Sequence, residues 1–425
     1  MLSTLRNAWK VPELRKRIIF TILMVAIIRM GNHIPVPGID TKSLASLAKT
    51  GTLFSFYDLM SGGALSSFSI FAMGVIPYIN SSIIFQLLTI AVPSLEQLSK
   101  EGEEGRKKIQ QYTRYGAIIL GALQSFGTYA LIRSTGAITN VSKFDVLLIV
   151  LTLTTASTFL MWLGDQITVK GIGNGVSLII FVNIISRLPQ KLMQIGSLQS
   201  TGAVSIIQVS LLGAFVILLF TGVVIATLSE RRIPIQYAGK AFGGKMVKGQ
   251  STHIPINMNA SGIIAIIFAM SVMQFPATIA NFWPDSALSK FITTSRYSVF
   301  RYNTWPYAVA MIILVVFFTW FYTEVTFKPD EMAENIHKSA GFIPGIRPGE
   351  PTAKFIERIL VRVSILGGLF AAVIAIIPMG IEGFTNFQGL QLGGTALLIE
   401  VGVALDFMRQ LESQLIMRHY KGFLR

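Results

Sequence analysis

Long apolar runs alternate with short polar or basic breaks along most of this chain. Ten runs stand out, and each is near the roughly 20 residues that an α-helix needs to cross about 30 Å of hydrocarbon. They lie at 18–35, 74–92, 112–132, 144–164, 176–194, 204–228, 260–282, 305–323, 360–380 and 394–408. The pattern predicts an all-α, polytopic membrane protein with ten transmembrane helices.

Two of the runs and one segment between runs carry polar residues at membrane depth. Gln124 lies inside the third run, and Asn183, Arg187 and Pro189 interrupt the fifth. Such positions are tolerated where protein or a water-filled cavity surrounds the helix, so we expect these helices to be buried in the bundle. Residues 52–70 are rich in Gly and Ser and too interrupted to span. They could pack inside the bundle or form an ordinary outer loop.

The composition agrees with lipid as the solvent. Of 425 residues, 52% are hydrophobic and 13% charged, whereas a soluble domain is about a quarter charged. The chain has no cysteine, which excludes disulfides, thiolate metal sites and a cysteine nucleophile. The start, MLSTLRNAWKVPELRKR, is amphipathic and basic without a small-residue cleavage site, so we interpret it as a retained N-terminus.

The formal charge of +15 lies in the loops rather than in the spans. Of the 36 Lys and Arg residues, 26 fall on the side of the N-terminus and 10 on the other. Positive charge marks the cytosolic side, so both termini are assigned to the cytosol. Two long loops, 229–259 and 324–358, share that side. Loops of this length are usually functional, although a solvated tether explains the pattern equally well.

Candidate catalytic chemistry is poor. The stretch GKAFGGKM at 239–246 has the Gly and Lys spacing of a phosphate-binding loop, but Met246 stands where a hydroxyl is needed for Mg²⁺ and no strand precedes it. The four histidines lie without metal-ligand spacing at His33, His253, His337 and His419. We expect no enzyme activity, no metal and no cofactor.

Glu400 is the one charged residue clearly placed inside a span. Such a charge costs roughly 2.5–3.5 kcal/mol at a helix centre and tends to be functional. Ion-coupled carriers normally keep several such groups near the midplane. A secondary carrier for small solutes is therefore the less favoured alternative, and a membrane scaffold without transport is a third.

The stretch SIFAMGVIPYINSSIIFQLL at 69–88 resembles the signature of the SecY family of protein translocation channels throughout its length. Seven further stretches resemble the family in the same order: GNHIPVPGID at 31–40, YDLMSGGALS at 57–66, KEGEEGRKKIQQYTRYG at 100–116, GIGNGVSLIIF at 171–181, ERRIPIQY at 230–237, GFIPGIRPGEPTAKFI at 341–356 and GGTALLIEVGVALD at 393–406. The resemblance covers nearly the whole chain.

The resemblance implies two inverted five-helix halves around a central pore, at 1–200 and 201–425. They would be hinged between the fifth and sixth helices, with a lateral gate between the second and third helices on one side and the seventh and eighth on the other. The implied function is passage of unfolded, signal-bearing polypeptides across, and laterally into, the lipids of the bacterial plasma membrane.

The resemblance also implies a closed state made of an apolar ring and a plug. The family pore ring falls on Ile79, Ile83, Val176, Ile180, Ile267 and Ile399. A ring of aliphatic side chains can exclude water and ions by dewetting. The plug corresponds to segment 55–69 and includes Tyr57, Asp58, Leu59, Met60, Ser61, Gly62, Gly63, Ala64 and Leu65. Its weak apolar character suits a segment that must leave when cargo enters.

The two cytosolic loops are implied to dock the SecA ATPase or a translating ribosome, beside the small subunits SecE and SecG. The basic residues concerned are Arg231, Arg232, Lys240, Lys245, Lys248 and Arg347. Glu400 departs from the family pattern, which has an aliphatic residue after the tenth-helix ring position. On a helix Glu400 points about 100° away from Ile399, so it faces a polar gate, pairs with a neighbouring helix or loosens the seal.

Overall fold

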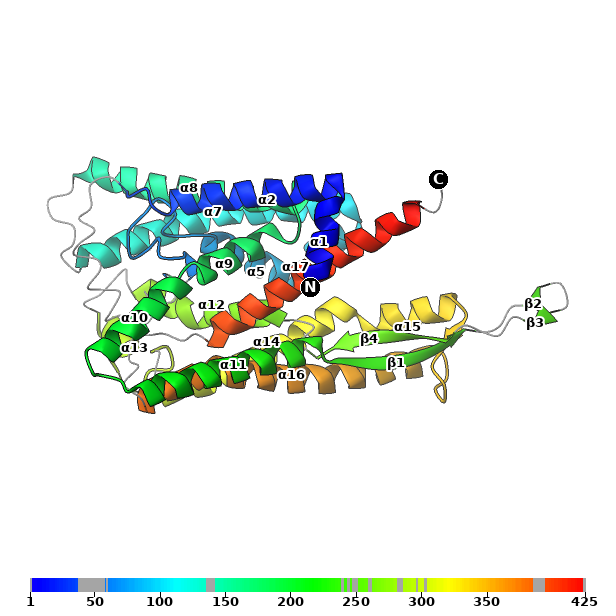
Figure 1. Cartoon of the computed structure of the whole chain (residues 1–425). Helices are drawn as coiled ribbons and strands as arrows, with labels where there is room; N and C mark the ends of the chain where they lie inside the picture. The colour runs from blue at the N-terminus through cyan, green and yellow to red at the C-terminus, as the bar shows by residue number, and fades with distance from the viewer. Residues whose placement is uncertain are drawn as a thin grey trace.

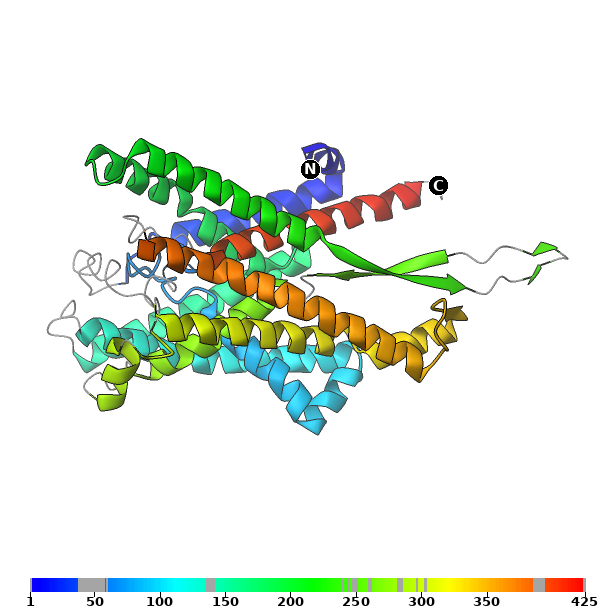
Figure 2. The same cartoon turned by 90° about the horizontal axis from the view of Figure 1, so that it is seen from below.

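The protein is a bundle of long helices that share one principal axis (Figures 1 and 2). The computed structural model covers the whole chain, and the structure describes residues 2–36, 58, 60–134, 142–237, 241–242, 245–246, 251–258, 262–280, 286–295, 297–301, 304–384 and 394–422.

Helices account for nearly all of the described membrane-depth chain. Those before residue 201 are α1 (Leu2–Lys10), α2 (Pro12–Gly31), α5 (Ile76–Ala91), α6 (Pro93–Lys100), α7 (Glu103–Ser134), α8 (Lys143–Lys170), α9 (Gly175–Ile185) and α10 (Leu188–Ser200). Those after it are α11 (Ile206–Leu228), α12 (Gly262–Ala280), α13 (Ala287–Thr294), α14 (Trp305–Phe327), α15 (Pro329–Lys338), α16 (Glu350–Phe384) and α17 (Gly394–Gly422). Each predicted span overlaps one or two of them.

The prediction of a helical membrane fold is confirmed. Five helical stretches of the described chain, two of them made of consecutive helices, are long and apolar enough to cross a membrane: Lys143–Lys170, Gly175–Ser200, Ile206–Leu228, Trp305–Lys338 and Glu350–Ile381. The pair α5 and α6 passes the same test together but is bent by 99°. The bend follows from Pro93, which begins α6 and cannot donate a backbone hydrogen bond into a continuing helix. The full count of ten crossings stays a prediction.

Local sequence signals set where several helices begin. Ser142 and Asp145 form a capping box at α8, and Ser205 and Gln208 form one at α11. Each box satisfies backbone N–H groups that the first helical turn leaves without partners.

The outer surface of α11 is apolar. Leu211 and Leu218 are 72% and 67% exposed, as expected for a helix that lipid surrounds.

The first long loop forms strands rather than irregular chain. β1 (Glu230–Tyr237) pairs antiparallel with β4 (Ser251–Asn257) and with β5 (Gly341–Phe342), giving the order β4-β1-β5. β2 (Ala241–Phe242) and β3 (Lys245–Met246) form a separate small hairpin. These strands, α15, α1 and the end of α17 all lie toward one end of the bundle (Figure 1).

Two large hydrophobic cores organise the bundle. The first core draws on α2, α5, α8 and α9 and also contains Ile399 of α17. The second core draws on α11, α12, α14, α16 and α17 and also contains Ile83 of α5. Each core thus includes at least one side chain from the other part of the chain, and α17 packs directly against α9.

Close backbone packing between α8 and α9 generates a first prediction. A Cβ at Gly175 would lie 2.0 Å from the carbonyl oxygen of Gly164, whereas a Cβ at Gly213 would meet nothing within 4 Å. Gly175→Ala should therefore force α9 away from α8 and destabilise the protein by about 1–3 kcal/mol. Thermal unfolding of the purified protein in detergent measures this. Gly213→Ala is the matched control and should not lower the midpoint, and equal midpoints for both variants would contradict the packing.

Candidate functional site

The six predicted ring residues gather along the seam between the two cores. Ile180 and Ile399 are buried in the first core and Ile83 in the second. Ile79 and Ile267 are partly buried and pack against both cores, while Val176 packs against the first. The structure therefore brings together side chains from α5, α9, α12 and α17 at one level of the bundle.

Helical spacing explains why two of these elements contribute pairs. Ile79 and Ile83 are four residues apart on α5, as are Val176 and Ile180 on α9, so each pair lies on one helix face. Six aliphatic side chains facing one seam supply no hydrogen-bonding group to water. An opening of this kind stays dry until something apolar enters it.

The helices predicted to form a lateral gate lie against one another. α12 contacts both α5 and α7, and α14 packs on α12. Along this side of the bundle the chain before residue 135 meets the chain after residue 261. The two parts of the chain are therefore in contact along the predicted gate.

The predicted plug segment packs in the same hydrophobic cluster as ring residues. Met60 and Ala64 are buried in the first core together with Ile180 and Ile399. Leu65 is buried in a neighbouring cluster with residues of α7 and α8. Tyr57 and Leu59, which were also assigned to the plug, lie outside the described residues.

Polar side chains of two helices bind the plug backbone. Asn183 of α9 donates from Nδ2 to the Met60 carbonyl oxygen at 3.0 Å. Asn32, which follows α2, donates to the Ser61 carbonyl oxygen at 3.3 Å and to Asn183 Oδ1 at 3.3 Å. Arg29 of α2 reaches the carbonyl oxygen of Gly62 at 3.5 Å. Three successive plug carbonyls thus have side-chain donors.

An ion pair ties the same segment to the end of α9. Arg187 Nη2 pairs with Asp58 Oδ2 and donates to Ser66 Oγ at 3.0 Å. The other carboxylate oxygen, Asp58 Oδ1, accepts from the Ser66 backbone N–H at 2.7 Å. Both oxygens of the carboxylate are therefore engaged.

Two glycines make this approach possible. Gly62 and Gly63 have φ values of +68° and +93°, a region that side chains rarely adopt. A Cβ at Gly63 would lie 2.5 Å from Arg187 Cζ, and one at Gly62 would lie 2.9 Å from Asn183 Oδ1. The Gly-Gly step lets the plug turn fit beneath the guanidinium and amide groups that hold it.

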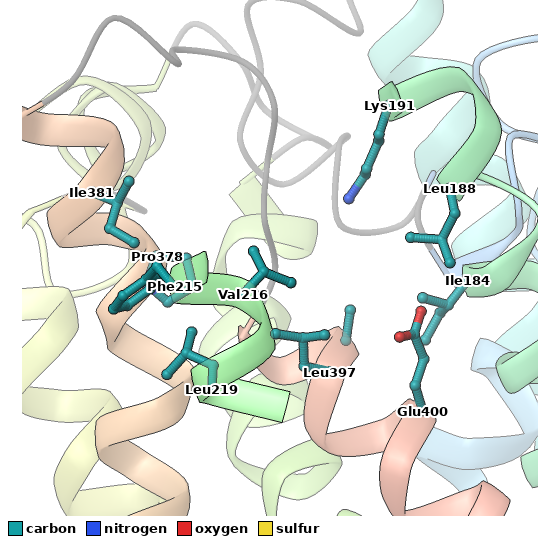
Figure 3. Close-up of a pocket in the computed structure, with 11 residues that line it drawn as sticks. Ile184, Leu188, Lys191, Phe215, Val216, Leu219, Pro378, Ile381, Leu397 and Glu400 are labelled. Atoms are coloured by element: carbon teal, nitrogen blue, oxygen red, sulfur yellow. The ribbon is translucent and has the colours of Figure 1, made fainter. Parts of the chain in front are cut away.

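Glu400 faces away from the ring. It lines a pocket together with Lys191, and their charged ends point into the same space (Figure 3). The rest of the lining is apolar and comes from α9, α10, α11, α16 and α17: Ile184, Leu188, Phe215, Val216, Leu219, Pro378, Ile381, Ala396 and Leu397. Of the three roles open to this carboxylate from sequence, the structure favours the one in which it faces a residue of a neighbouring helix.

The predicted docking residues lie on the projecting end of the molecule. Arg231 and Arg232 are exposed on β1, and Arg232 pairs with Glu230 at 2.6 Å. Arg347 is exposed in the turn between β5 and α16. Lys245 lies on β3, which extends beyond the bundle (Figure 2). Lys240 and Lys248 lie outside the described residues.

The aliphatic residues at the seam are suited to blocking a passage through the bundle. Within the described ranges no three His, Asp or Glu side chains are grouped to hold a metal ion. The ring itself is aliphatic, and its polar neighbours are occupied with plug backbone. The arrangement is an apolar constriction with a hydrogen-bonded segment packed against it.

Comparison with known proteins decides the family. The profile of the SecY family matches residues 69–408. Protein translocase subunit SecY of Halalkalibacterium halodurans is 44% identical over 436 aligned residues, covering the whole of both chains. The chain belongs to the SecY family.

Solved structures show the same fold at low sequence identity. The structure of a protein conducting channel has a TM-score of 0.66 at 19% identity, covering 94% of this chain and 92% of the other. Sec61 in the canine ribosome-channel complex from the endoplasmic reticulum has a TM-score of 0.62 at 18% identity, with the same coverage. The fold of this SecY-family chain is therefore that of a protein channel.

Sequence reasoning missed the residues that hold the plug. Asn183 and Arg187 were interpreted only as interruptions of a span, and Arg29 entered only the count of charges on the side away from the N-terminus. Asn32 was not singled out. The available signal was that Asn183 and Arg187 lie four residues apart, so they share a helix face and serve one partner.

The different directions of Ile399 and Glu400 generate a prediction for this SecY-family channel. Ile399→Asn places an amide in the aliphatic seam and should raise the resting ion conductance by about tenfold or more, equivalent to ~1.4 kcal/mol of closed-state stability. Glu400→Gln should leave it unchanged, because that side chain faces the pocket. Conductance of the purified complex in planar bilayers measures both, and an equal leak from Glu400→Gln would place Glu400 in the seal.

Proposed function

We propose that this chain is the central subunit of a bacterial protein-conducting channel. It passes unfolded polypeptides across the plasma membrane and releases hydrophobic segments laterally into lipid. The observation that carries the proposal is the aliphatic seam shared by the two cores, with the plug packed in the same cluster. Flexible aliphatic side chains part around a chain of any sequence and close behind it without offering water a partner.

The proposed orientation has both termini in the cytosol. α1, the end of α17, the three-stranded sheet and α15 lie toward one end of the bundle (Figure 1). That end carries 26 of the 36 Lys and Arg residues when loops are assigned alternately, as the positive-inside rule expects for a cytosolic side. The plug then lies on the outer side of the ring, and cargo meets the ring first.

The proposed lateral exit lies between α12 and the pair α5 and α7. These helices come from the two parts of the chain and are in contact with each other. Hydrophobic segments of cargo leave there because burial in lipid is favourable by about 25 cal/mol per Å² of apolar surface. The two halves proposed for this motion are residues 1–200 and 201–425.

The proposed partners supply both assembly and energy. SecE and SecG complete the membrane complex, and SecA or a translating ribosome drives the polypeptide. The cytosolic face is basic, with exposed Arg231, Arg232 and Arg347, which suits phosphate groups of ribosomal RNA as well as acidic protein surfaces. Sec61, a structural neighbour, is described in a ribosome-channel complex. Membership of the SecY family gives no support to the alternative of a secondary carrier for small solutes.

A cysteine staple across the plug tests the proposed function. The chain contains no cysteine, and a Cβ at Gly74 would lie 3.8 Å from Ser61 Cβ, the mean separation in disulfides. With SecE, SecA and ATP in vesicles, Ser61→Cys/Gly74→Cys should translocate a signal-bearing precursor when reduced and lose translocation when oxidised.

Each single-cysteine variant is the matched control and should be insensitive to oxidation. The wild-type complex should take up precursor but no small solute in response to an ion gradient. Gradient-driven solute uptake without precursor transport would instead establish the carrier.

Charge reversal at the exposed turn tests the docking surface. Arg347→Glu should lower SecA-driven export by about tenfold, because it places a negative charge where a complementary partner surface meets the turn. The bundle should stay folded, because the Arg347 side chain is exposed. The hydrogen bond from Thr352 Oγ1 goes to the backbone oxygen of Arg347 at 2.9 Å, and the substitution keeps that oxygen. Lys143→Glu reverses an exposed charge at the start of α8, outside both predicted docking loops, and is the control. Export and thermal unfolding are measured together, and full export by Arg347→Glu would remove it from the docking surface.

A further inference from the structure

The plug carries one residue that is charged at neutral pH. Within 55–69 this is Asp58, and its side chain is 13% exposed, while that of its partner Arg187 is 19% exposed. Exposed ion pairs contribute little to stability, but breaking a buried pair leaves an uncompensated charge and is strongly unfavourable. The contact between Asp58 and Arg187 is therefore the plug interaction with the largest energetic consequence when it breaks.

The ion pair is fixed by a local hydrogen-bond network. Ser66 donates its backbone N–H to Asp58 Oδ1, and its hydroxyl accepts from Arg187. Gly63 donates its backbone N–H to the Asp58 carbonyl oxygen at 2.9 Å. On the other side Gln190 Oε1 accepts from Arg187 Nη1 at 2.6 Å. Carboxylate and guanidinium are each oriented by a second partner, which makes the pair a defined contact rather than a chance surface encounter.

The pair joins the removable element to a helix that supplies the ring. Arg187 lies two residues beyond the end of α9, whose residues Val176 and Ile180 lie in the seam. Met60 and Ala64, on either side of the Gly-Gly turn, are in the same cluster. The plug cannot leave the seam unless Asp58 separates from Arg187. The opening equilibrium therefore contains the free energy of this one contact.

Cargo opens the channel only as far as it binds the open state better than the closed state. A hydrophobic signal segment supplies that difference by entering the lipid-facing gate, and a longer or more apolar segment supplies more of it. With the ion pair as a latch on the plug, a stronger ion pair then requires a more hydrophobic signal segment. We propose that the Asp58–Arg187 ion pair sets the minimum signal hydrophobicity that opens this channel, which makes the two residues specificity determinants. This inference rests on the proposed function.

A double-mutant cycle in the assembled, reconstituted channel tests the proposal. The variants are Asp58→Asn, Arg187→Gln and the double variant, assayed with one precursor that has a normal signal and one whose apolar core is shortened. Each single variant should raise transport of the weak-signal precursor by about tenfold or more over wild type. Resting ion conductance should rise in parallel, and transport of the normal precursor should stay near wild type.

The double variant separates a latch from two unrelated roles. If the residues act through each other, its gain is well below the product of the two single gains, because no charge is left unpaired. Gains that multiply would overturn the latch. A misfolded variant loses transport, so a gain cannot come from unfolding. Ser67→Ala is the matched plug control: Ser67 is exposed and donates to the plug's own Gly63 carbonyl oxygen at 2.9 Å, so it should behave as wild type.

Two failures remain distinguishable. If wild-type channel does not transport the normal precursor, the proposed function fails. If wild type transports it and the single variants match wild type on the weak signal and in conductance, the latch proposal fails and the channel function stands.

Discussion

The structure depends on one constraint: backbone that is not helical cannot lie at membrane depth unless protein supplies its hydrogen bonds. Segment 60–74 is a series of turns inside the bundle, so its carbonyls need donors. Asn183, Asn32 and Arg29 supply them to Met60, Ser61 and Gly62. The polar residues that make α2 and α9 look like poor membrane spans are therefore the price of keeping an irregular segment among helices.

Ring and plug solve different parts of the sealing problem. The ring is aliphatic, and its closure depends on dispersion contacts that any apolar chain can replace. The plug is held by directional bonds and an ion pair, which water can replace once the seam is wet. A segment bound by apolar burial alone would compete with cargo for the same contacts. The proposed plug combines both kinds of contact, because Met60 and Ala64 are buried in the first core while its carbonyls and Asp58 have polar partners.

Much of the fold could be predicted because the periodic apolar signal is strong. All ten apolar runs overlap helices of the described chain, and the breaks at Pro93 and Pro189 lie where helices are bent or interrupted. The strands of loop 229–259 were not predicted, since Arg-Arg-Ile-Pro-Ile alternates too briefly for a period-two signal. Its buried Ile233 and Ile235 pack on Ile256, a contact that only pairing with β4 creates.

The candidate site was harder to predict from the sequence, because aliphatic residues of the ring and of the core have the same local sequence pattern. Nothing in the local pattern distinguishes Ile399 from Leu398, which is also buried but belongs to the second core. The polar partners were visible as exceptions, yet their roles depend on a turn more than a hundred residues away: Asn183 bonds Met60, and Arg187 bonds Asp58.

Glu400 shows the same limit of prediction from the sequence. Adjacent to a ring position in sequence, it faces a separate pocket with Lys191. Because one helical step turns the side chain by about 100°, a charged residue can sit beside the ring in the chain while the seam itself stays apolar. The seam therefore constrains one face of α17 and leaves the next free to vary.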